Sequence, residues 1–424
     1  MATCLALILA GGRGERLGSL TGFTAKPAVH FGGNRRIIDF SLKNCADSGV
    51  SPIGVITQYN ASELHKHVSS VYRNKEVYLL PSSLTGTFYE GTADAVYKNS
   101  RFVDRFDPDH VLILAGDHVY NMDYQKMLDF HVSAGADVTI ASHRTPMHQA
   151  SRFGILTVGT GGQVIDFEEK PVKPKSDMAS MGVYIFKWEV LREILDQDHL
   201  RLDSRHDFGA DVIPTMLRSG YALKTHEYQG YWRDVGTVES LWEASMELLD
   251  LKSMRSRWQI EDFYFGGLGK SNPFGALVHQ SVVPVNCSIS GKVERSVLGD
   301  QVTVSKGAKI INSVIMPDVF IGSNVRIQNA IVGAGAEILD DVIIGVRDGS
   351  RFFTDKKLCT GGVSLVEPGV QIPKMMKFRN GAHITEAKLL EWAEATWQAL
   401  EAKPGIGWLL PDLVAARDHE PIHA

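Results

Sequence analysis

The stretch LALILAGGRGERL (Leu5–Leu17) decides how the first half of the chain folds. Its apolar run ends abruptly at Gly11, which is typical of a buried strand that leads into a tight turn. Glycines have no Cβ, so the backbone N–H groups of such a turn can approach an anion closely. Together with Arg13, Arg16 and the later Lys26, the pattern predicts a polyphosphate-binding turn at the carboxyl end of a strand. The alternative is a glycine-rich surface turn with solvated arginines.

Strand-like and helix-like segments alternate over the first 250 residues. Amphipathic stretches such as 60–72 and 124–134 lie between short apolar runs, which predicts strands connected by helices. Such an alternation is typical of an α/β fold with a doubly wound, mostly parallel sheet, whose ligands bind beyond the carboxyl ends of the strands. We assign residues 1–252 to this domain. The apolar runs are Leu5–Leu9, Ile53–Ile56, Val111–Leu114, Val138–Ile140, Ile155–Val158 and Val183–Phe186.

Between about Val282 and Val346 the helical periodicity disappears, and aliphatic residues recur at fixed intervals instead. The spacing is six residues within each triplet, and equivalent positions recur every 17 residues. This repeat predicts a three-sided parallel β-helix with each aliphatic side chain pointing into the prism, whereas a set of ordinary short strands is the alternative. The nine positions are Leu298, Val304, Ile310, Ile315, Ile321, Ile327, Val332, Ile338 and Ile344.

The segments around the repeat give weaker signals. We interpret the glycine-rich segment 253–281 as a linker, 282–346 as the β-helix domain and 347–424 as a C-terminal extension of unknown role. Within this extension, the pattern of Thr385–Ala402 predicts an amphipathic helix with Thr385 as its N-cap.

The composition limits the class of protein. At 424 residues the chain is too long for one typical core, and its 44% hydrophobic and 22% charged residues are ordinary for a globular protein. A net charge of −5 excludes the global basic field typical of nucleic-acid binding, whereas a local basic excess in the first 40 residues suits a small anionic ligand. The cysteines lack metal-like spacing, and no segment resembles a signal peptide or membrane span, so we expect a cytoplasmic protein without a membrane partner.

Two aspartates are candidate ligands for a metal ion. In VLILAGDHVY (Val111–Tyr120) an apolar strand delivers Asp117 to the strand-end region, where a carboxylate can hold Mg²⁺ together with phosphate oxygens. In YWRDVGT (Tyr231–Thr237), Asp234 precedes a predicted helix, and the two aspartates could clamp one metal ion. The alternatives are a turn or helix cap for Asp117 and an ion pair with Arg233 for Asp234.

A further set of residues suits a sugar phosphate. In VIDFEEKP (Val164–Pro171), Lys170 offers a point charge for a phosphate and Glu169 can accept hydrogen bonds from sugar hydroxyls, although a charged strand end is the alternative. No nucleophile motif stands out, so we expect direct displacement at phosphorus, driven by positioning and charge neutralisation. Hydroxyl acceptors and an aromatic face for the sugar are offered by Ser180, Tyr184, Asp207 and Phe208.

Taken together, these motifs resemble those of the bacterial glucose-1-phosphate adenylyltransferases, in order and over roughly residues 4–345. The resemblance rests on LAGGRGERL, AKPAVHFGG, RIIDF, VITQY, GTADAV, LAGDHVY, FEEKP, ASMGVYIF, HDFGADVIP and YWRDVGT. It implies a nucleotidyltransferase domain followed by a left-handed β-helix. It also implies in-line attack of glucose 1-phosphate on the α-phosphorus of ATP with Mg²⁺, giving ADP-glucose and pyrophosphate for glycogen synthesis.

The same resemblance implies roles for individual residues. The catalytic residues are Arg16, Lys26 and Asp117. The nucleotide-binding residues are Leu9, Ala10, Gly11, Gly12, Arg13, Gly14, Gln58, Gly91, Thr92, Ala93 and Asp94. The residues around the sugar phosphate are Glu169, Lys170, Ser180, Gly182, Tyr184, Asp207, Phe208 and Trp232. Asp117 and Asp234 bind Mg²⁺.

The resemblance further implies a tetramer, either of this chain alone or with a related subunit, and a small-molecule allosteric effector. Many members of the family carry basic residues just before AKP, where this chain has Phe23 and Thr24, so we expect weak or absent activation by fructose 1,6-bisphosphate. The loop Pro81–Tyr89 is also shorter than in many members. The alternatives are a sugar-1-phosphate nucleotidyltransferase with another base or sugar, or a regulatory subunit of a mixed oligomer.

Overall fold

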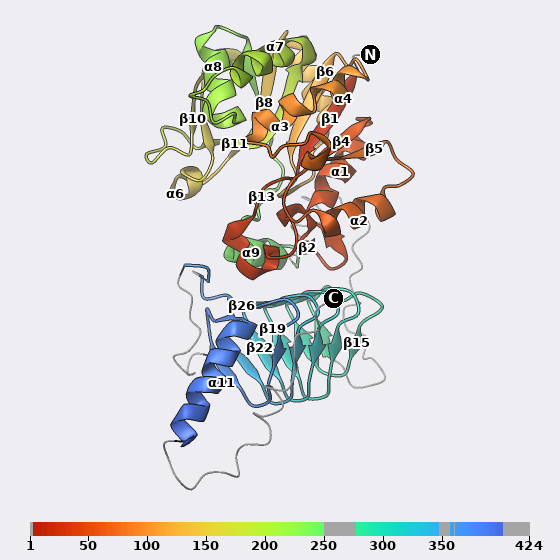
Figure 1. The fold of residues 1–424 in the computed structure, drawn as a ribbon, viewed down its shortest axis with the longest axis vertical. Coiled ribbons are helices and arrows are strands. Elements are labelled where there is room, and N and C mark those ends of the chain that lie inside the picture. The colour runs from red at the N-terminus through yellow and green to blue at the C-terminus, as the bar shows by residue number, and fades with distance from the viewer. Residues whose placement is uncertain (1–2, 250–276, 347–356, 360, 402–424) are drawn as a thin grey trace. The chain divides into compact units, whose positions relative to one another are not determined.

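The computed structural model describes residues 3–249, 277–346, 357–359 and 361–401. The chain forms two compact units, one covering 1–263 and the other 264–424 (Figure 1). Most of the predicted linker, 253–276, lies outside the described residues, as do residues 402–424 of the predicted extension.

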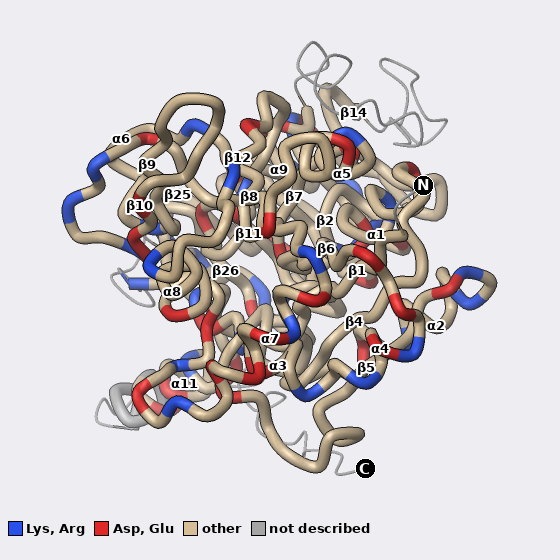
Figure 2. The backbone as a smooth tube through the Cα atoms, turned by 90° about the horizontal axis from the view of Figure 1, so that it is seen from above, with Lys and Arg blue, Asp and Glu red and all other residues tan. Residues whose placement is uncertain are grey.

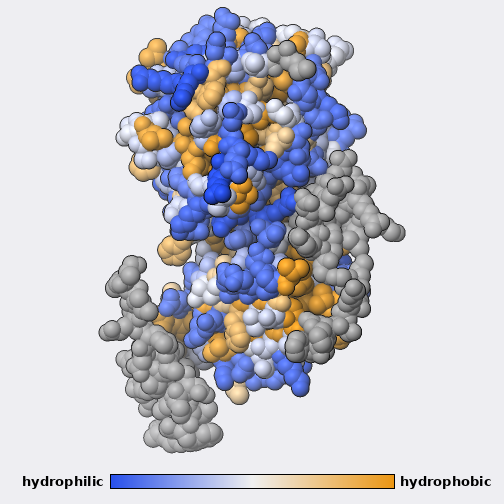
Figure 3. Space-filling view, turned by 90° about the vertical axis from the view of Figure 1, so that its right-hand side faces the viewer, coloured by the Kyte–Doolittle hydropathy of each residue, from blue (hydrophilic) through white to orange (hydrophobic). Residues whose placement is uncertain are grey.

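The charges of the described residues are spread along the chain. Lys and Arg positions are interspersed with Asp and Glu positions rather than gathered in one stripe (Figure 2). On the face drawn in Figure 3, hydrophilic side chains predominate among the described residues, and hydrophobic ones form scattered patches. None of the helices that the structure describes has the length and apolar character needed to cross a membrane.

The first unit is built on a nine-stranded sheet. Its strands are β1 (Cys4–Leu9), β4 (Ile53–Thr57), β5 (Val77–Pro81), β6 (His110–Ala115), β8 (Val138–Arg144), β9 (Gly154–Val158), β10 (Val164–Glu169), β11 (Met178–Lys187) and β12 (Leu223–Glu227). The main order is β10-β9-β11-β6-β1-β4-β5, and β8 pairs with both β11 and β12. The central strand β1 is parallel to β4 and β6, and the antiparallel pairings involve β11 and β10. The sheet is therefore mostly parallel, as the sequence predicts.

Helices cover both faces of this sheet. Successive residues of β1 point to opposite faces, and each face packs in a core of its own. Leu5 and Leu7 pack in one core with the helices α3 and α7, whereas Ala6 and Ile8 pack in the other with α1, α2 and α5. The predicted doubly wound arrangement is confirmed. The helices of this unit are α1 (Ile38–Asp47), α2 (Ser62–Val71), α3 (Thr92–Lys98), α4 (Ser100–Asp104), α5 (Tyr124–Ser133), α6 (Met147–Ala150), α7 (Trp188–His199), α8 (Ile213–Arg218) and α9 (Val238–Glu247).

Two short strand pairs complete the first unit. The hairpin of β2 (His30–Phe31) and β3 (Arg35–Arg36) follows the AKP motif. The antiparallel pair of β7 (His118–Tyr120) and β13 (Trp232–Asp234) places Asp234 opposite His118. This second pairing joins the two motifs that carry the candidate metal-binding aspartates.

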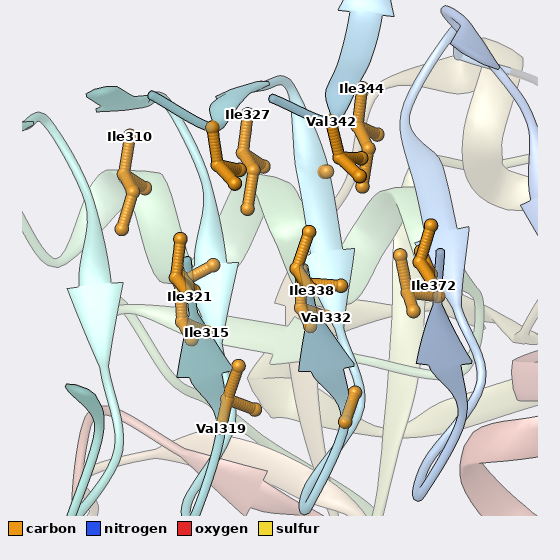
Figure 4. Close-up of a cluster of buried hydrophobic side chains, with 14 of the residues drawn as sticks. Ile310, Ile315, Val319, Ile321, Ile327, Val332, Ile338, Val342, Ile344 and Ile372 are labelled. Atoms are coloured by element: carbon orange, nitrogen blue, oxygen red, sulfur yellow. The ribbon is translucent and has the colours of Figure 1, made fainter. Parts of the chain in front are cut away.

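The second unit is a parallel β-helix, as the 17-residue repeat predicts. All nine predicted aliphatic residues are at most 1% exposed, and Figure 4 shows several of them pointing into the interior between the strands. The chain turns between strands at residues with positive φ, such as Gln301, Asp318 and Gly335, which recur every 17 residues. Glycine adopts this conformation freely and Asp does so more readily than most residues, which explains two of these corners.

Three sheets form the sides of the β-helix. The first contains β14 (Leu277–His279), β16 (Lys292–Glu294), β19 (Lys309–Ile311), β22 (Arg326–Gln328), β25 (Ile343–Val346) and β28 (Lys377–Arg379). The second contains β15 (Ser288–Ile289), β18 (Thr303–Val304), β21 (Phe320–Ile321), β24 (Glu337–Ile338) and β27 (Gln371–Ile372). The third contains β17 (Val297–Leu298), β20 (Val314–Ile315), β23 (Ala330–Val332), β26 (Ser364–Val366) and β29 (His383–Ile384).

The β-helix is longer than the predicted range 282–346. It begins with β14 and continues through β26 to β29, so part of the predicted extension 347–424 forms the last coil. The sequence hides this coil because Ile338 pairs with Ile372, which is twice the usual 17 residues further along. The helix α11 (Glu386–Glu401) follows, and the hydroxyl of Thr385 accepts a hydrogen bond of 3.2 Å from the backbone N–H of Lys388, which confirms the predicted N-cap.

We predict that Ile321→Ala destabilises the β-helix by about 2–5 kcal/mol, because the fully buried side chain leaves a cavity that the coils on either side cannot close. The measurement is the midpoint of thermal unfolding of the full chain, followed by circular dichroism. Arg326→Ala is the matched control, since this side chain is exposed on the following strand, β22, and its removal should change the midpoint little. Equal shifts for the two variants would contradict the assignment of Ile321 to the core.

Candidate active site

The glycine-rich turn follows β1 and leads into a short helical segment, Glu15–Thr21. Gly14 has φ of 67°, and a Cβ there would lie 3.0 Å from Cβ of Lys26, so the turn needs glycine at this position. Arg13 has its guanidinium 4.6 Å from the ring centroid of Tyr59, which in turn stacks on Phe88 at 5.8 Å. The turn is thereby placed at the carboxyl end of β1 with its basic side chains at the edge of a cleft.

This cleft has a volume of about 740 Å³ and collects residues from many separate segments of the first unit. Most of the residues predicted from the sequence line it. They are Leu9, Ala10, Gly11, Gly12, Arg13, Gly14, Arg16, Lys26, Gln58, Gly91, Thr92, Asp117, Glu169, Gly182, Tyr184, Asp207 and Phe208. The cleft also contains residues that sequence reasoning did not select, among them Tyr59, Tyr89 and Gly236.

A buried lysine joins the two candidate metal ligands. Nζ of Lys26 lies 2.8 Å from Oδ2 of Asp117 and 2.9 Å from Oδ1 of Asp234. The side chain of Lys26 is 6% exposed and that of Asp234 10% exposed, whereas Asp117 is more open to the cleft. Residues 26, 117 and 234 are far apart in sequence, and the structure brings their charged groups into direct contact.

The electrostatics keep all three groups charged. Burial by itself lowers the pKa of Lys26, but the charges of Asp117 and Asp234 outweigh it, and the pKa lies above its ordinary value. Burial raises the pKa of each aspartate, but Lys26 and then His118 outweigh it, so both pKa values lie below the ordinary range. At neutral pH the site therefore holds two carboxylates with an ammonium group between them.

Further cationic and nitrogen-bearing groups surround these aspartates. Arg16 and Arg152 each have a guanidinium nitrogen close to Oδ2 of Asp234, at 3.8 and 3.7 Å. Nε2 of His118 lies 3.6 Å from Oδ1 of Asp117. Sequence reasoning missed Arg152 because no pattern marks the segment before β9, and it passed over His118 although the residue directly follows Asp117.

The predicted sugar-phosphate residues divide into groups. The ring of Tyr184 stacks on Phe208 with centroids 5.8 Å apart, which gives the cleft an aromatic wall. Asp207 accepts a hydrogen bond of 2.9 Å from the hydroxyl of Thr92 and others from the backbone N–H groups that it caps. Glu169 ends β10 and faces the cleft. These residues form one end of the cleft.

Lys170 does not line the cleft in this structure. Its side chain is 65% exposed, and Nζ forms an ion pair of 2.6 Å with Oε1 of Glu169. The residue has φ of 47°, so the backbone turns at this point, directly after β10. A flexible lysine at the end of the cleft wall can change its partner without a change in the fold.

Four other predicted residues lie behind the cleft wall. Asp94 is buried and accepts hydrogen bonds from Nζ of Lys98 and from the backbone N–H of Glu90, which is a structural role within α3. Ala93 and Ser180 are buried as well, and the Ser180 hydroxyl lies 3.2 Å from that of Tyr184. Trp232 packs its ring against His118 and lines a separate cavity of about 410 Å³.

Gln58 lines the cleft, but its amide group is engaged. Oε1 accepts a hydrogen bond of 2.6 Å from the backbone N–H of Tyr89, and Nε2 donates one of 3.4 Å to the carbonyl oxygen of the same residue. Gln58 therefore holds the end of the loop Pro81–Tyr89 beside the glycine-rich turn. This contact positions the loop, and the nucleotide-binding role that the family resemblance implies for Gln58 stays a prediction.

The comparisons with known proteins agree with this geometry. Residues 5–251 match the nucleotidyl transferase family, and residues 270–366 match the GlmU-like C-terminal hexapeptide family, in agreement with the left-handed β-helix of the expected fold class. The chain is 46% identical over 354 residues to the glucose-1-phosphate adenylyltransferase of Bacillus cytotoxicus and 45% identical to that of Bacillus mycoides. Each alignment covers 80% of this chain and 94% of the relative. The chain therefore belongs to the glucose-1-phosphate adenylyltransferase family of nucleotidyl transferases.

Proposed function

We propose that this protein transfers the adenylyl group of ATP to glucose 1-phosphate and releases ADP-glucose and pyrophosphate. The observation that carries the proposal is the contact of Lys26 with Asp117 and Asp234 beside the glycine-rich turn. The relatives named for this reaction are similar to the chain over nearly their whole length, which supports the same choice of substrates. ADP-glucose then serves glycogen synthesis.

Mg²⁺ fits the donor atoms of this site. The ammonium group of Lys26 lies between the two carboxylates, so oxygens of both already share one cation. Hard oxygen donors are the ligands that Mg²⁺ prefers, and it commonly combines one or two carboxylates with phosphate oxygens. When bound, Mg²⁺ would neutralise charge on the phosphates during transfer.

Backbone groups and side chains of this protein bind the phosphates and stabilise the charge that develops during transfer. The backbone N–H groups of the Gly11–Gly14 turn bind phosphate oxygens, and Arg13 and Arg16 add positive charge next to them. Lys26 stays protonated because of its raised pKa, and it stabilises the charge that develops on the α-phosphate. A phosphate monoester is largely a dianion at neutral pH, so the attacking oxygen of glucose 1-phosphate needs no general base. We infer in-line displacement without a covalent enzyme intermediate.

The far end of the cleft suits the sugar. Glu169 and Asp207 offer carboxylate oxygens to hydroxyl groups, and the stacked rings of Tyr184 and Phe208 offer an apolar face. Lys170 leaves its ion pair with Glu169 and binds the phosphate of glucose 1-phosphate, which frees the carboxylate for the sugar. This exchange couples arrival of the phosphate to recognition of the glucose.

Three further expectations stay predictions. The family resemblance implies a tetramer, alone or with a related subunit, and the composition implies a cytoplasmic protein. Activation by fructose 1,6-bisphosphate is expected to be weak or absent. Phe23 is 88% exposed, and neither it nor Thr24 offers a cationic group to a sugar bisphosphate. The alternative of another base is tested by assay of the purified protein with ATP, UTP, GTP and dTTP. Absence of activity with all four would favour the alternative of a regulatory subunit. Dominant activity with a nucleotide other than ATP would overturn the proposal.

Asp117→Asn and Asp234→Asn are each predicted to lower kcat by about 10²-fold or more, because the charge that holds the metal ion is lost while the side-chain shape is kept. The measurement is pyrophosphate release with ATP and glucose 1-phosphate. Asp123→Asn is the control, since this side chain caps α5 outside the cleft, and the variant should lose at most about 1 kcal/mol of stability with kcat unchanged. An unchanged kcat in Asp117→Asn or in Asp234→Asn would remove that aspartate from the mechanism.

Lys170→Ala is predicted to raise the KM for glucose 1-phosphate about tenfold or more and to change kcat less, because its contact with the phosphate is present before and during the reaction. The KM for ATP should stay the same. Lys175→Ala is the matched control. This lysine lies five residues after Lys170, is also exposed and also forms ion pairs with acidic side chains, those of Asp166 and Glu168. An unchanged KM for glucose 1-phosphate in Lys170→Ala would show that the sugar-phosphate site is placed wrongly.

Fructose 1,6-bisphosphate is predicted to activate the enzyme less than about tenfold, because Phe23 and Thr24 supply no positive charge for its phosphates. The measurement is the initial rate at saturating and subsaturating ATP over a range of effector concentrations. The variant Phe23→Lys/Thr24→Arg should respond more strongly than the wild type. Strong activation of the wild type would locate the effector contacts elsewhere in the chain.

A further inference from the structure

His118 stands at the candidate metal site with a nitrogen atom that the proposed reaction does not use. One possible ligand atom each from Asp117, His118 and Asp234 lie within 4.8 Å of one another. The separation between Nε2 of His118 and Oδ1 of Asp117 is 3.6 Å. Donor atoms bound to one octahedral cation at about 2.1 Å lie between about 3 and 4.2 Å apart, so this pair already has a spacing that a shared metal ion allows.

The orientation of the imidazole ring is fixed from two sides. Nδ1 lies 3.1 Å from the carbonyl oxygen of Met181, which can only accept, so Nδ1 carries the hydrogen atom. In the neutral ring the lone pair is then on Nε2, the nitrogen next to Asp117. The ring of Trp232 contacts the imidazole at a centroid distance of 5.4 Å and an interplanar angle of 88°. The side chain of His118 is 14% exposed, so it has little freedom to turn away.

We propose that Nε2 of His118 is a third protein ligand of the divalent metal ion held by Asp117 and Asp234. The proposal rests on the proposed function, because it takes the metal ion to bind between these two aspartates. Met181 then acts as the positioning partner, since a hydrogen bond from the second ring nitrogen is the usual way in which a ligating histidine is oriented. Trp232, which does not line the cleft, acquires a role as the support of this ring.

A nitrogen ligand changes which metal ions the site favours. Mg²⁺ prefers oxygen donors, whereas Mn²⁺ and Co²⁺ accept imidazole nitrogen readily. The mixed donor set should therefore bind Mn²⁺ more tightly than a site made of carboxylates alone, with a smaller gain for Mg²⁺. The opposing interpretation is that His118 acts only as an ion-pair partner of Asp117 and never touches the metal ion.

The test is pulsed electron paramagnetic resonance of the full-length wild-type protein loaded with Mn²⁺. We expect the modulation of a directly coordinated ¹⁴N nucleus, and we expect it to change to that of ¹⁵N when the protein is labelled with ¹⁵N-histidine. The labelling distinguishes His118 from the nitrogens of a bound nucleotide, and the spectra are recorded without ATP as well. Spectra of the wild type without a coordinated histidine nitrogen would overturn the proposal.

His118→Asn separates the ligand role from a structural one. The amide nitrogen of asparagine can occupy the place of Nδ1 and keep the hydrogen bond to Met181, while nothing replaces Nε2. We expect the nitrogen modulation to disappear and the dissociation constant for Mn²⁺ to rise about tenfold, with a smaller rise for Mg²⁺. His148→Asn, which changes an exposed histidine of α6, should alter neither quantity. Unchanged Mn²⁺ binding in His118→Asn would support the ion-pair interpretation and overturn ours.

Formation of ADP-glucose by the wild-type protein is measured in parallel. A protein that makes ADP-glucose but shows no histidine nitrogen at Mn²⁺ overturns only the role of His118. A protein that binds Mn²⁺ through His118 but makes no ADP-glucose overturns the proposed function and leaves the metal-binding inference in place.

Discussion

The contact of the buried Lys26 with Asp117 and Asp234 is the constraint on which the site depends. Both carboxylates contact the same ammonium group, so they lie close together and repel each other. Loss of the lysine charge would leave the buried Asp234 uncompensated, at a cost of about 3–5 kcal/mol. The ammonium group therefore keeps both aspartates ionised and fixed in place.

The glycine-rich turn, Asp117 and Asp234 come from different strands of the first unit, and the fold brings them together. The strand β1 ends at the glycine-rich turn, β6 ends just before Asp117, and the pairing of β7 with β13 brings Asp234 beside His118. Parallel β1 and β6 have their carboxyl ends at the same edge of the sheet, which explains why their loops meet. The short antiparallel pair then fixes the position of Asp234 by backbone hydrogen bonds, so the spacing between the carboxylates does not rely on flexible loops.

The cleft combines a charged end with an end that suits a sugar. Lys26 and Arg16 line the charged end of the cleft and lie close to Asp234, whereas Glu169, Asp207 and the stacked rings of Tyr184 and Phe208 lie further along the wall. A phosphate-rich substrate and a hydroxyl-rich one can therefore bind at neighbouring places without competing for the same groups. This division is what direct transfer between two bound substrates requires.

The sequence by itself determined the fold class and most of the residues that line the cleft. Apolar runs that end in glycine marked the strand ends, and the 17-residue repeat marked the β-helix, because both patterns follow from local backbone geometry. Local patterns failed where the answer depended on a contact between distant segments. The last coil of the β-helix was hidden by the doubled spacing between Ile338 and Ile372. The hydrogen bonds that Asp94 accepts from Lys98 and from the backbone of Glu90 were not visible in the sequence either.

Only the tertiary structure decided which groups meet. Nothing in the sequence placed Arg152 against Asp234, turned Trp232 away from the cleft and onto His118, or engaged the amide of Gln58 with the backbone of Tyr89. The physical reason is that side-chain partners are set by packing and by the need to satisfy buried polar groups, and these depend on neighbours in space. The residue types indicate which chemistry is possible, and the tertiary structure determines which side chains lie close enough to carry it out.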